Sequence, residues 1–172
     1  MTGVPESDLP SGGGAPDDEP RVVAALSLVR PPVSTAQDVL ETVAALALER
    51  GFVRPTFAQA LVDRERQHPT GLPTPTPVAI PHTDVEHVVR PALAAVLLDP
   101  PVAFGEMGGM GSDVAVRLVV VLMVTDPAGQ VGLLSRLITA LRAPDLGSVL
   151  ADVQEPDGLA AAVQGLIGPP GA

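Results

Sequence analysis

Short apolar runs and longer stretches with helical spacing alternate along this chain. The short runs are rich in Val, Leu and Ala, and the last two of them, at 91–99 and 113–125, are apolar on both faces of an extended segment. Such runs are typical of buried strands, which need a covering layer on each side of the sheet. They predict strands at 21–29, 77–82, 91–99 and 113–125.

The stretches between these runs repeat their apolar residues every three or four positions, as helices do. Near the start of one stretch, Ser34 and Gln37 have the spacing of a capping box, and Gly51 is placed to end that helix. Asp126 precedes another stretch as a candidate N-cap. Helices are predicted at 31–51, 54–67, 125–145, 144–153 and 155–168.

Strands that alternate with helices predict an α/β domain with layers around a central sheet. The predicted domain covers residues 21–168. Residues 1–20 are dominated by Gly, Pro, Ser and acidic residues, so we expect a disordered tail there. The glycine-rich segment 104–112 lacks the GxGxxG order of a nucleotide-binding loop, and we interpret it as a connection between two strands.

The composition supports one buried core. The chain has 172 residues, of which 46% are hydrophobic, a size typical of a single domain. All three aromatic residues are Phe, so Ala, Val and Leu must fill most of the core. No apolar run approaches the ~20 residues that span a bilayer. The N-terminus lacks the basic start and apolar centre of a signal peptide, and we expect a cytoplasmic protein.

Charge and cysteine content exclude several classes of function. The net charge is −10, and all ten basic residues are Arg. This balance argues against nonspecific binding to nucleic acid or to an anionic membrane. It suits either a partner with a basic face or solubility alone. The chain has no Cys, which excludes disulfides, a thiolate nucleophile and Cys-based zinc sites.

The three histidines lie within one stretch, "HPTGLPTPTPVAIPHTDVEH", at residues 68–87. A metal site could use His82, Asp84 and His87, although their spacing is not that of a helical HExxH site. A Ser-His-Asp hydrolase would need a GxSxG elbow, which the sequence lacks. Each histidine could also be an ordinary polar residue with its hydrogen bonds satisfied.

A nucleophilic histidine is a further possibility, because a neutral imidazole can attack phosphorus without a separate base. His82 would stand at the end of a strand, where Pro81 stiffens the chain. Thr70 and Thr83 could donate hydroxyl hydrogens to phosphoryl oxygens, and the planar guanidinium of Arg64 matches a phosphate. The residues alone leave the metal site, the hydrolase and the phosphoryl acceptor open.

The segment "LVDRERQHPTGLPTPTPVAIPHTD" resembles the enzyme IIA domain of the fructose–mannitol class of the bacterial phosphoenolpyruvate-dependent sugar phosphotransferase system. The family pattern is an Arg-Glu pair, a Pro-Thr-Gly turn and an apolar strand that ends in Ile-Pro-His. The resemblance continues in "DVAVRLVVVLMVTDP" and "LLSRLITALRAPD", and it spans residues 22–167. The pattern falls here on Arg64-Glu65, Pro69-Thr70-Gly71 and Ala79-Ile80-Pro81-His82.

The resemblance implies a single domain with a mixed central β-sheet sandwiched between α-helices. It implies that His82 accepts a phosphoryl group from HPr and passes it to a cysteine of enzyme IIB, while the membrane protein enzyme IIC imports the sugar. It implies that no metal ion or organic cofactor takes part, and that Arg64 lines the active site.

Gln130 indicates the branch of the family that the chain resembles most. Mannitol and fructose members carry a second active-site histidine at the matching position, whereas the galactitol-like branch has a Gln there. An amide can donate a hydrogen bond to a phosphoryl oxygen but cannot gain a proton. The expected catalytic set is therefore His82 as acceptor, with Arg64, Thr83 and Gln130 as groups that hold the phosphoryl oxygens.

Two other functions stay open beside this one. A regulatory enzyme IIA-like protein would control a partner through its phosphorylation state, and a sequence with only an enzyme IIA-type domain is compatible with that role. A non-catalytic interaction domain could keep the same fold, although the presence of both His82 and Arg64 favours catalysis.

Overall fold

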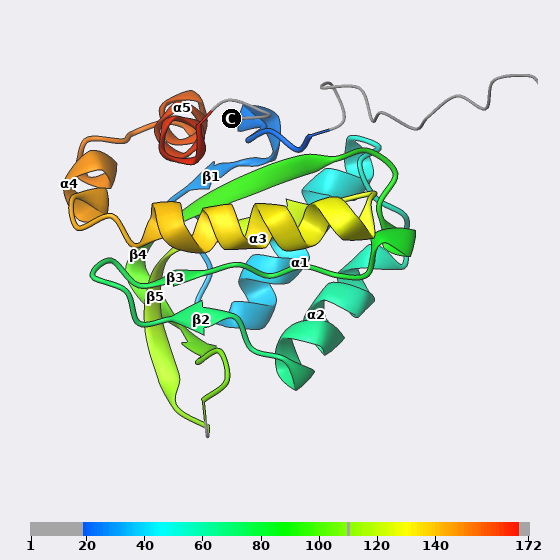
Figure 1. The fold of residues 1–172 in the computed structure, drawn as a ribbon, viewed down its shortest axis with the longest axis horizontal. Helices are drawn as coiled ribbons and strands as arrows, with labels where there is room; N and C mark the ends of the chain where they lie inside the picture. The colour runs from blue at the N-terminus through cyan, green and yellow to red at the C-terminus, as the bar shows by residue number, and fades with distance from the viewer. Residues whose placement is uncertain (1–18, 110, 169–172) are drawn as a thin grey trace, which may run out of the picture.

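The computed structural model describes residues 19–109 and 111–168 (Figure 1). The tail expected at residues 1–20 lies outside the described residues, except for its last two positions. One of these, Glu19, forms an ion pair with Arg136, which connects this residue to the rest of the domain.

The sheet is mixed, as the resemblance implied. Its strands are β1 (Leu28–Val29), β2 (Gly71–Leu72), β3 (Val78–Ala79), β4 (Ala92–Gly105) and β5 (Asp113–Met123), in the spatial order β1-β4-β5-β3-β2. The two long strands, β4 and β5, form a central antiparallel hairpin. β1 runs parallel to β4 and β3 parallel to β5, whereas β2 and β3 are antiparallel.

Helices cover both faces of this sheet. They are α1 (Ala36–Glu49), α2 (Phe57–Gln67), α3 (Pro127–Leu141), α4 (Leu146–Ala151) and α5 (Pro156–Ile167). Each corresponds to a helix predicted from apolar spacing, with shorter ends. None of the helices in the described part of the chain is long and apolar enough to cross a membrane.

Side chains of β4 alternate between two cores, one on each face of the sheet. Ala94 and Val96 lie in the cluster that α1 and α2 complete, whereas Leu93 and Ala95 lie in the cluster completed by α3, α4 and α5. All four side chains are fully buried, as a run that is apolar on both faces predicts. Figure 1 shows α3 crossing in front of the strands, with α1 behind them.

The strand predicted at 21–29 is wrong for most of its length. Within 21–29 only β1 is a regular strand, because Val22 forms a single bridge with Leu93 and Ala24–Leu26 form a 3-10 turn. Ser27 explains the break, because its hydroxyl donates to Val23 O (2.9 Å) and accepts from Ala95 N–H (3.1 Å). The Ser27 hydroxyl thus accepts the Ala95 N–H that a backbone carbonyl would accept in a regular strand. The apolar pattern of the sequence does not reveal this competition between side chain and backbone.

The predicted capping box is displaced by one residue. Thr35 rather than Ser34 is the N-cap of α1, and its hydroxyl accepts a hydrogen bond from Asp38 N–H (3.1 Å). The carboxylate of Asp38 then lies in the first turn of α1, where it accepts hydrogen bonds from Ser34. A negative charge at this end of the helix interacts favourably with the helix dipole. Gln37 makes its hydrogen bonds with other side chains. Gly51 follows the helix with a φ of 77°, which confirms it as the terminating residue.

β4 is longer than predicted. It continues past residue 99 to Gly105, after an irregularity in its pairing with β5 between Leu97 and Val102. Pro100 and Pro101 end the predicted strand because proline cannot donate to a ladder, and the irregularity accommodates them. The glycine-rich connection is correspondingly shorter than the segment 104–112.

Candidate active site

His82 lies at the end of an extended segment that continues β3. β3 pairs with β5 in parallel, and the same register brings His82 opposite Leu122. Leu122 N–H donates to Pro81 O (2.9 Å), but Pro81 has no N–H of its own, which interrupts the ladder. The strand predicted at 77–82 is therefore regular over Val78–Ala79 only, and it keeps its direction as far as His82.

One ring nitrogen of His82 is held by the backbone. Nδ1 lies 2.9 Å from Ile80 O, which is an acceptor, so Nδ1 carries the hydrogen and donates it. The lone pair then lies on Nε2, which forms no hydrogen bond with the described residues.

The environment keeps the half-buried ring of His82 neutral. Burial lowers the pKa of His82 below its usual value of 6.5. The bond to Ile80 and the charge of Asp84 oppose this effect, whereas the positive charge of Arg64 reinforces it. A neutral imidazole with a free lone pair on Nε2 is the form that can act as a nucleophile.

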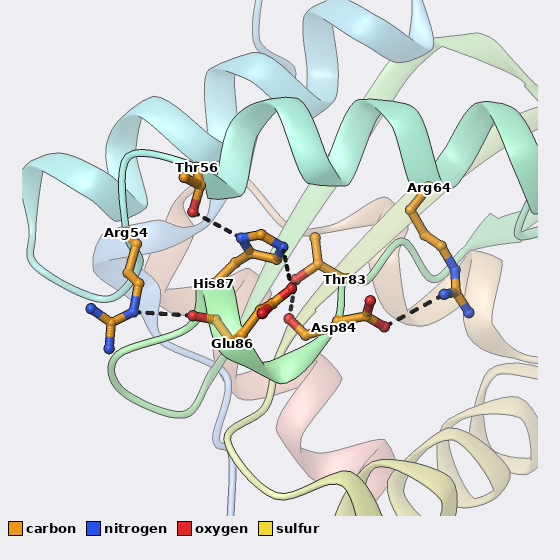
Figure 2. Close-up of polar contacts among 7 residues, drawn as sticks. All are labelled: Arg54, Thr56, Arg64, Thr83, Asp84, Glu86 and His87. Atoms are coloured by element: carbon orange, nitrogen blue, oxygen red, sulfur yellow. Dashed lines mark hydrogen bonds and ion pairs between the residues drawn. The ribbon is translucent and has the colours of Figure 1, made fainter.

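Arg64 reaches the site from the last turn of α2. Its Nη1 lies 3.7 Å from Asp84 Oδ1 (Figure 2). The two side chains are 40% and 76% exposed, so the ion pair itself contributes little to stability. The Nε of Arg64 is buried and has no hydrogen-bond partner among the described residues. A buried donor without a partner is costly, so an acceptor at this position would be favoured. Arg64 thus offers both a positive charge and a free N–H to an anionic group.

Thr83 and Gln130 meet where the loop after His82 passes the first turn of α3. Gln130 Nε2 donates to Thr83 O (3.3 Å) and so uses one of its two amide hydrogens. The predicted N-cap, Asp126, accepts hydrogen bonds of 3.2 Å from two backbone N–H groups at the start of α3.

The hydroxyl of Thr83 already has an acceptor. It donates to Asp84 O (2.9 Å; Figure 2), so its hydrogen is used within the loop.

Thr70 is not available as a phosphoryl donor, so this prediction is wrong. Its side chain is buried, and its hydroxyl lies 3.1 and 2.9 Å from the two carboxylate oxygens of Glu65. Burial raises the pKa of Glu65 to about 7, and the hydrogen bonds from Thr70 oppose that rise. Glu65 has a place in the family pattern, but no role of its own was predicted for it, although it follows Phe57 and Leu61 at four-residue spacing on the buried face of α2.

His87 connects the segment after His82 to the turn before α2 through hydrogen bonds. Its Nδ1 lies 2.8 Å from Thr56 Oγ1, and its Nε2 lies 3.4 Å from a carboxylate oxygen of Glu86 (Figure 2). Arg54 adds a bond from its N–H to His87 O (2.9 Å) and one from its Nε to Glu86 O (3.0 Å). Both ring nitrogens of His87 thus have partners, and the ring serves the fold.

The metal site and the hydrolase find no support in the described residues. Within 19–109 and 111–168, no group of three or more His, Cys, Asp or Glu side chains is placed to hold a metal ion. Asp84 pairs with Arg64, and His87 bonds to Thr56, so these two do not join His82 in a ligand set. No described serine forms a hydrogen bond with a histidine ring.

A family model described as the phosphoenolpyruvate-dependent sugar phosphotransferase system, EIIA 2, matches residues 25–164. The chain belongs to this family. The galactitol-specific EIIA component of the phosphotransferase system of Escherichia coli (strain K12) is 34% identical over 119 residues, which cover 69% of this chain and 79% of that protein. EIIA components are phosphotransferases that carry a phosphoryl group, and this EIIA chain is a phosphocarrier of the system.

Solved structures of other EIIA proteins share the fold. The crystal structure of IIA mannitol from Escherichia coli superposes with a TM-score of 0.67 at 22% identity, covering 83% of this EIIA chain and 99% of that one. The complex of enzyme IIAMTL and phosphorylated enzyme IIBMTL from Escherichia coli gives a TM-score of 0.66 at 23% identity, with coverages of 84% and 98%. These likenesses confirm the mixed sheet between helices.

Proposed function

We propose that His82 carries the phosphoryl group of this EIIA chain, on its Nε2 atom. The main support is the 2.9 Å hydrogen bond from Nδ1 to Ile80 O, because it leaves the lone pair on Nε2. This lone pair forms a bond to the phosphorus of the donor, while the bond from phosphorus to the donor breaks and its electron pair stays with the donor. The lowered pKa of His82 keeps the attacking ring uncharged at neutral pH, with its one hydrogen on Nδ1.

Three neighbours would hold the phosphoryl oxygens. Arg64 supplies charged donors, and its Nε has no partner among the described residues. Gln130 supplies the second hydrogen of its amide. Thr83 contributes once its hydroxyl turns away from the Asp84 carbonyl, which costs one local hydrogen bond. Because Gln130 cannot be protonated, Arg64 provides the positive charge that balances the transferred group.

We further propose HPr as the donor and a cysteine of an enzyme IIB as the acceptor. Family membership and the structural neighbour solved with phosphorylated enzyme IIBMTL support this pair. The sequence has no Cys, which suits an acceptor thiol on the partner. The name of the 34% identical relative makes galactitol the first sugar alcohol to test, imported through a membrane enzyme IIC. In this proposal the exchange takes place in the cytoplasm and needs no metal ion or organic cofactor.

A regulatory role is the weaker proposal. A regulatory EIIA protein would carry the phosphoryl group on the same His82 and control a partner through it. The relative at 34% identity is named for a sugar alcohol, which favours transport. Reading frames for enzymes IIB and IIC beside the gene would favour transport further, and a gene without such neighbours would favour regulation.

Intact-mass analysis after incubation with phosphoenolpyruvate, enzyme I and HPr tests the assignment of His82. The wild type should gain a single acid-labile phosphoryl adduct, and His82→Ala should gain none. His68→Ala is the matched control, because His68 is exposed at the end of α2 and should not affect labelling. An adduct on another residue of His82→Ala would overturn the assignment. A wild type that never labels with HPr from the same organism would favour a non-catalytic interaction domain.

A further inference from the structure

A chain of hydrogen bonds connects a buried carboxylate to the ring of His82. The Thr70 hydroxyl donates to Glu65 (2.9 Å) and accepts from Ile80 N–H (3.1 Å). Ile80 O in turn accepts from His82 Nδ1 (2.9 Å). Glu65 and Thr70 are 8% and 4% exposed, and Ile80 is fully buried. The transfer described above assigns no part to Glu65 or Thr70.

Thr70 supplies an acceptor where a strand would otherwise offer a carbonyl. β2 and β3 are antiparallel with Gly71 opposite Ala79, and the same register sets Thr70 opposite Ile80. At this position the Thr70 hydroxyl accepts the Ile80 N–H. Glu65 holds Thr70 in place by accepting from its N–H (2.9 Å) and its hydroxyl. Side chains from α2 and from the residue just before β2 thus orient Ile80, two positions before His82.

We propose that Glu65 and Thr70 are positioning residues that hold His82 in the tautomer with its hydrogen on Nδ1. The inference rests on the proposed function in one respect, that His82 is the phosphoryl acceptor. The N–H and the C=O of Ile80 belong to successive peptide groups, so the chain acts through geometry rather than through polarisation. Thr70 fixes the N–H of Ile80, and the carbonyl of the same residue selects the nitrogen that keeps the hydrogen.

Burial makes this arrangement sensitive to the loss of one hydroxyl. Without it, Ile80 N–H would be buried with no acceptor, and the segment would move to recover one. Such a movement turns the Ile80 carbonyl away from Nδ1 and removes the bond that selects the tautomer. Some molecules would then carry the hydrogen on Nε2, where the nitrogen has no lone pair for phosphorus.

Three threonine variants test the inference. Thr70→Val removes the hydroxyl and keeps the shape, and Thr70→Ser restores a hydroxyl. Thr76→Val is the matched control, because Thr76 is likewise buried, at 8% exposed, and its hydroxyl forms no hydrogen bond with the described residues. Two-bond ¹⁵N–¹H NMR correlations report the tautomer of His82 in the unphosphorylated protein. Steady-state kinetics with phospho-HPr report kcat and KM separately.

Thr70→Val should show the Nε2–H tautomer and a kcat lower by about tenfold, which corresponds to about 1.4 kcal/mol. The KM for HPr should not change, because the buried Thr70 side chain cannot contact a partner. Thr70→Ser should restore the wild-type tautomer and most of kcat, and Thr76→Val should match the wild type. If Thr70→Val does not fold, Glu65→Leu replaces it, because Leu removes both acceptors of Thr70, with the same tautomer change and a loss of about threefold.

A folded Thr70→Val with the tautomer and kcat of the wild type would overturn the inference. An equal loss of kcat in Thr76→Val would do so too, because any buried threonine would then have the same effect. A wild type that never labels defeats the proposed function instead. The NMR readout does not depend on phosphoryl transfer, so it then decides the positioning role by itself.

Discussion

The buried carboxyl of Glu65 allows a quantitative prediction about stability. Burial raises its pKa from 4.5 to about 7 in the folded chain. Between these values the folded state binds a proton that the unfolded state has already lost. The stabilisation is therefore fully present below pH 4.5 and is lost as the pH rises through about 7. Each pH unit between the two pKa values is worth about 1.4 kcal/mol, so the total is about 3 kcal/mol.

Glu65→Gln removes this contribution and keeps the shape of the side chain. The free energy of unfolding of the variant, minus that of the wild type, should rise by about 3 kcal/mol between about pH 4 and about pH 8. His82 has a lowered pKa and favours the folded state above pH 6.5, but it is present in both proteins and cancels. Urea unfolding over this pH range measures the difference. Glu49→Gln, which removes an exposed carboxylate at the end of α1, sets the background.

A difference that stays flat with pH would refute the raised pKa of Glu65. Glu65 borders a cavity of about 370 Å³ that Arg66 also lines. In that case, water in the cavity and the positive charge of Arg66 would stabilise the Glu65 carboxylate and keep its pKa near the usual value of 4.5. This result would change the charge assigned to Glu65 and leave its hydrogen bonds to Thr70 in place. Stability against pH and the tautomer of His82 are therefore independent measurements.

Four further predictions concern the site and its support. Arg64→Gln should lower phosphoryl transfer by about tenfold to a hundredfold in single-turnover assays, because a charged donor is lost, while Arg66→Gln should transfer like the wild type. His87→Ala should keep most transfer activity and lose about 1 kcal/mol in urea unfolding; a loss of transfer as complete as in His82→Ala would contradict its structural role. The single-turnover rate should fall only below pH 6.5, since the lowered pKa of His82 delays its protonation, and a midpoint above 6.5 would count against this. Asp126→Ala should cost about 1 kcal/mol in thermal unfolding through loss of the N-cap of α3, and an unchanged melting temperature would contradict it.

Much of the fold and part of the site could be predicted from the sequence. Runs that are apolar on both faces can be buried only between two layers, so they place the long strands at the centre of the domain. Pro81 followed by His82 predicts the end of a strand, and in the structure His82 is the last residue of this segment to pair with β5, opposite Leu122. Arg64 was predicted from its guanidinium chemistry, and the structure brings its charge close enough to affect the pKa of His82.

The roles of the threonines could not be predicted in this way. A hydroxyl can donate to a phosphoryl group or to any nearby acceptor, and the sequence does not say which acceptor is near. Thr70 is engaged by Glu65, five residues before it, only because the chain turns between α2 and β2. The Thr83 carbonyl receives a bond from Gln130, 47 residues away, because α3 packs beside the loop.

The layers of the fold and the set of groups able to do chemistry could be predicted from the residues, since apolar periodicity and side-chain type are local properties. The tertiary structure decided which of those groups are free to act. It placed the hydrogen of His82 on Nδ1, left Arg64 Nε without a partner among the described residues and engaged Thr70 with a buried carboxylate. The physical reason is that each hydrogen bond depends on which distant segments pack together, and burial makes an unmatched partner costly.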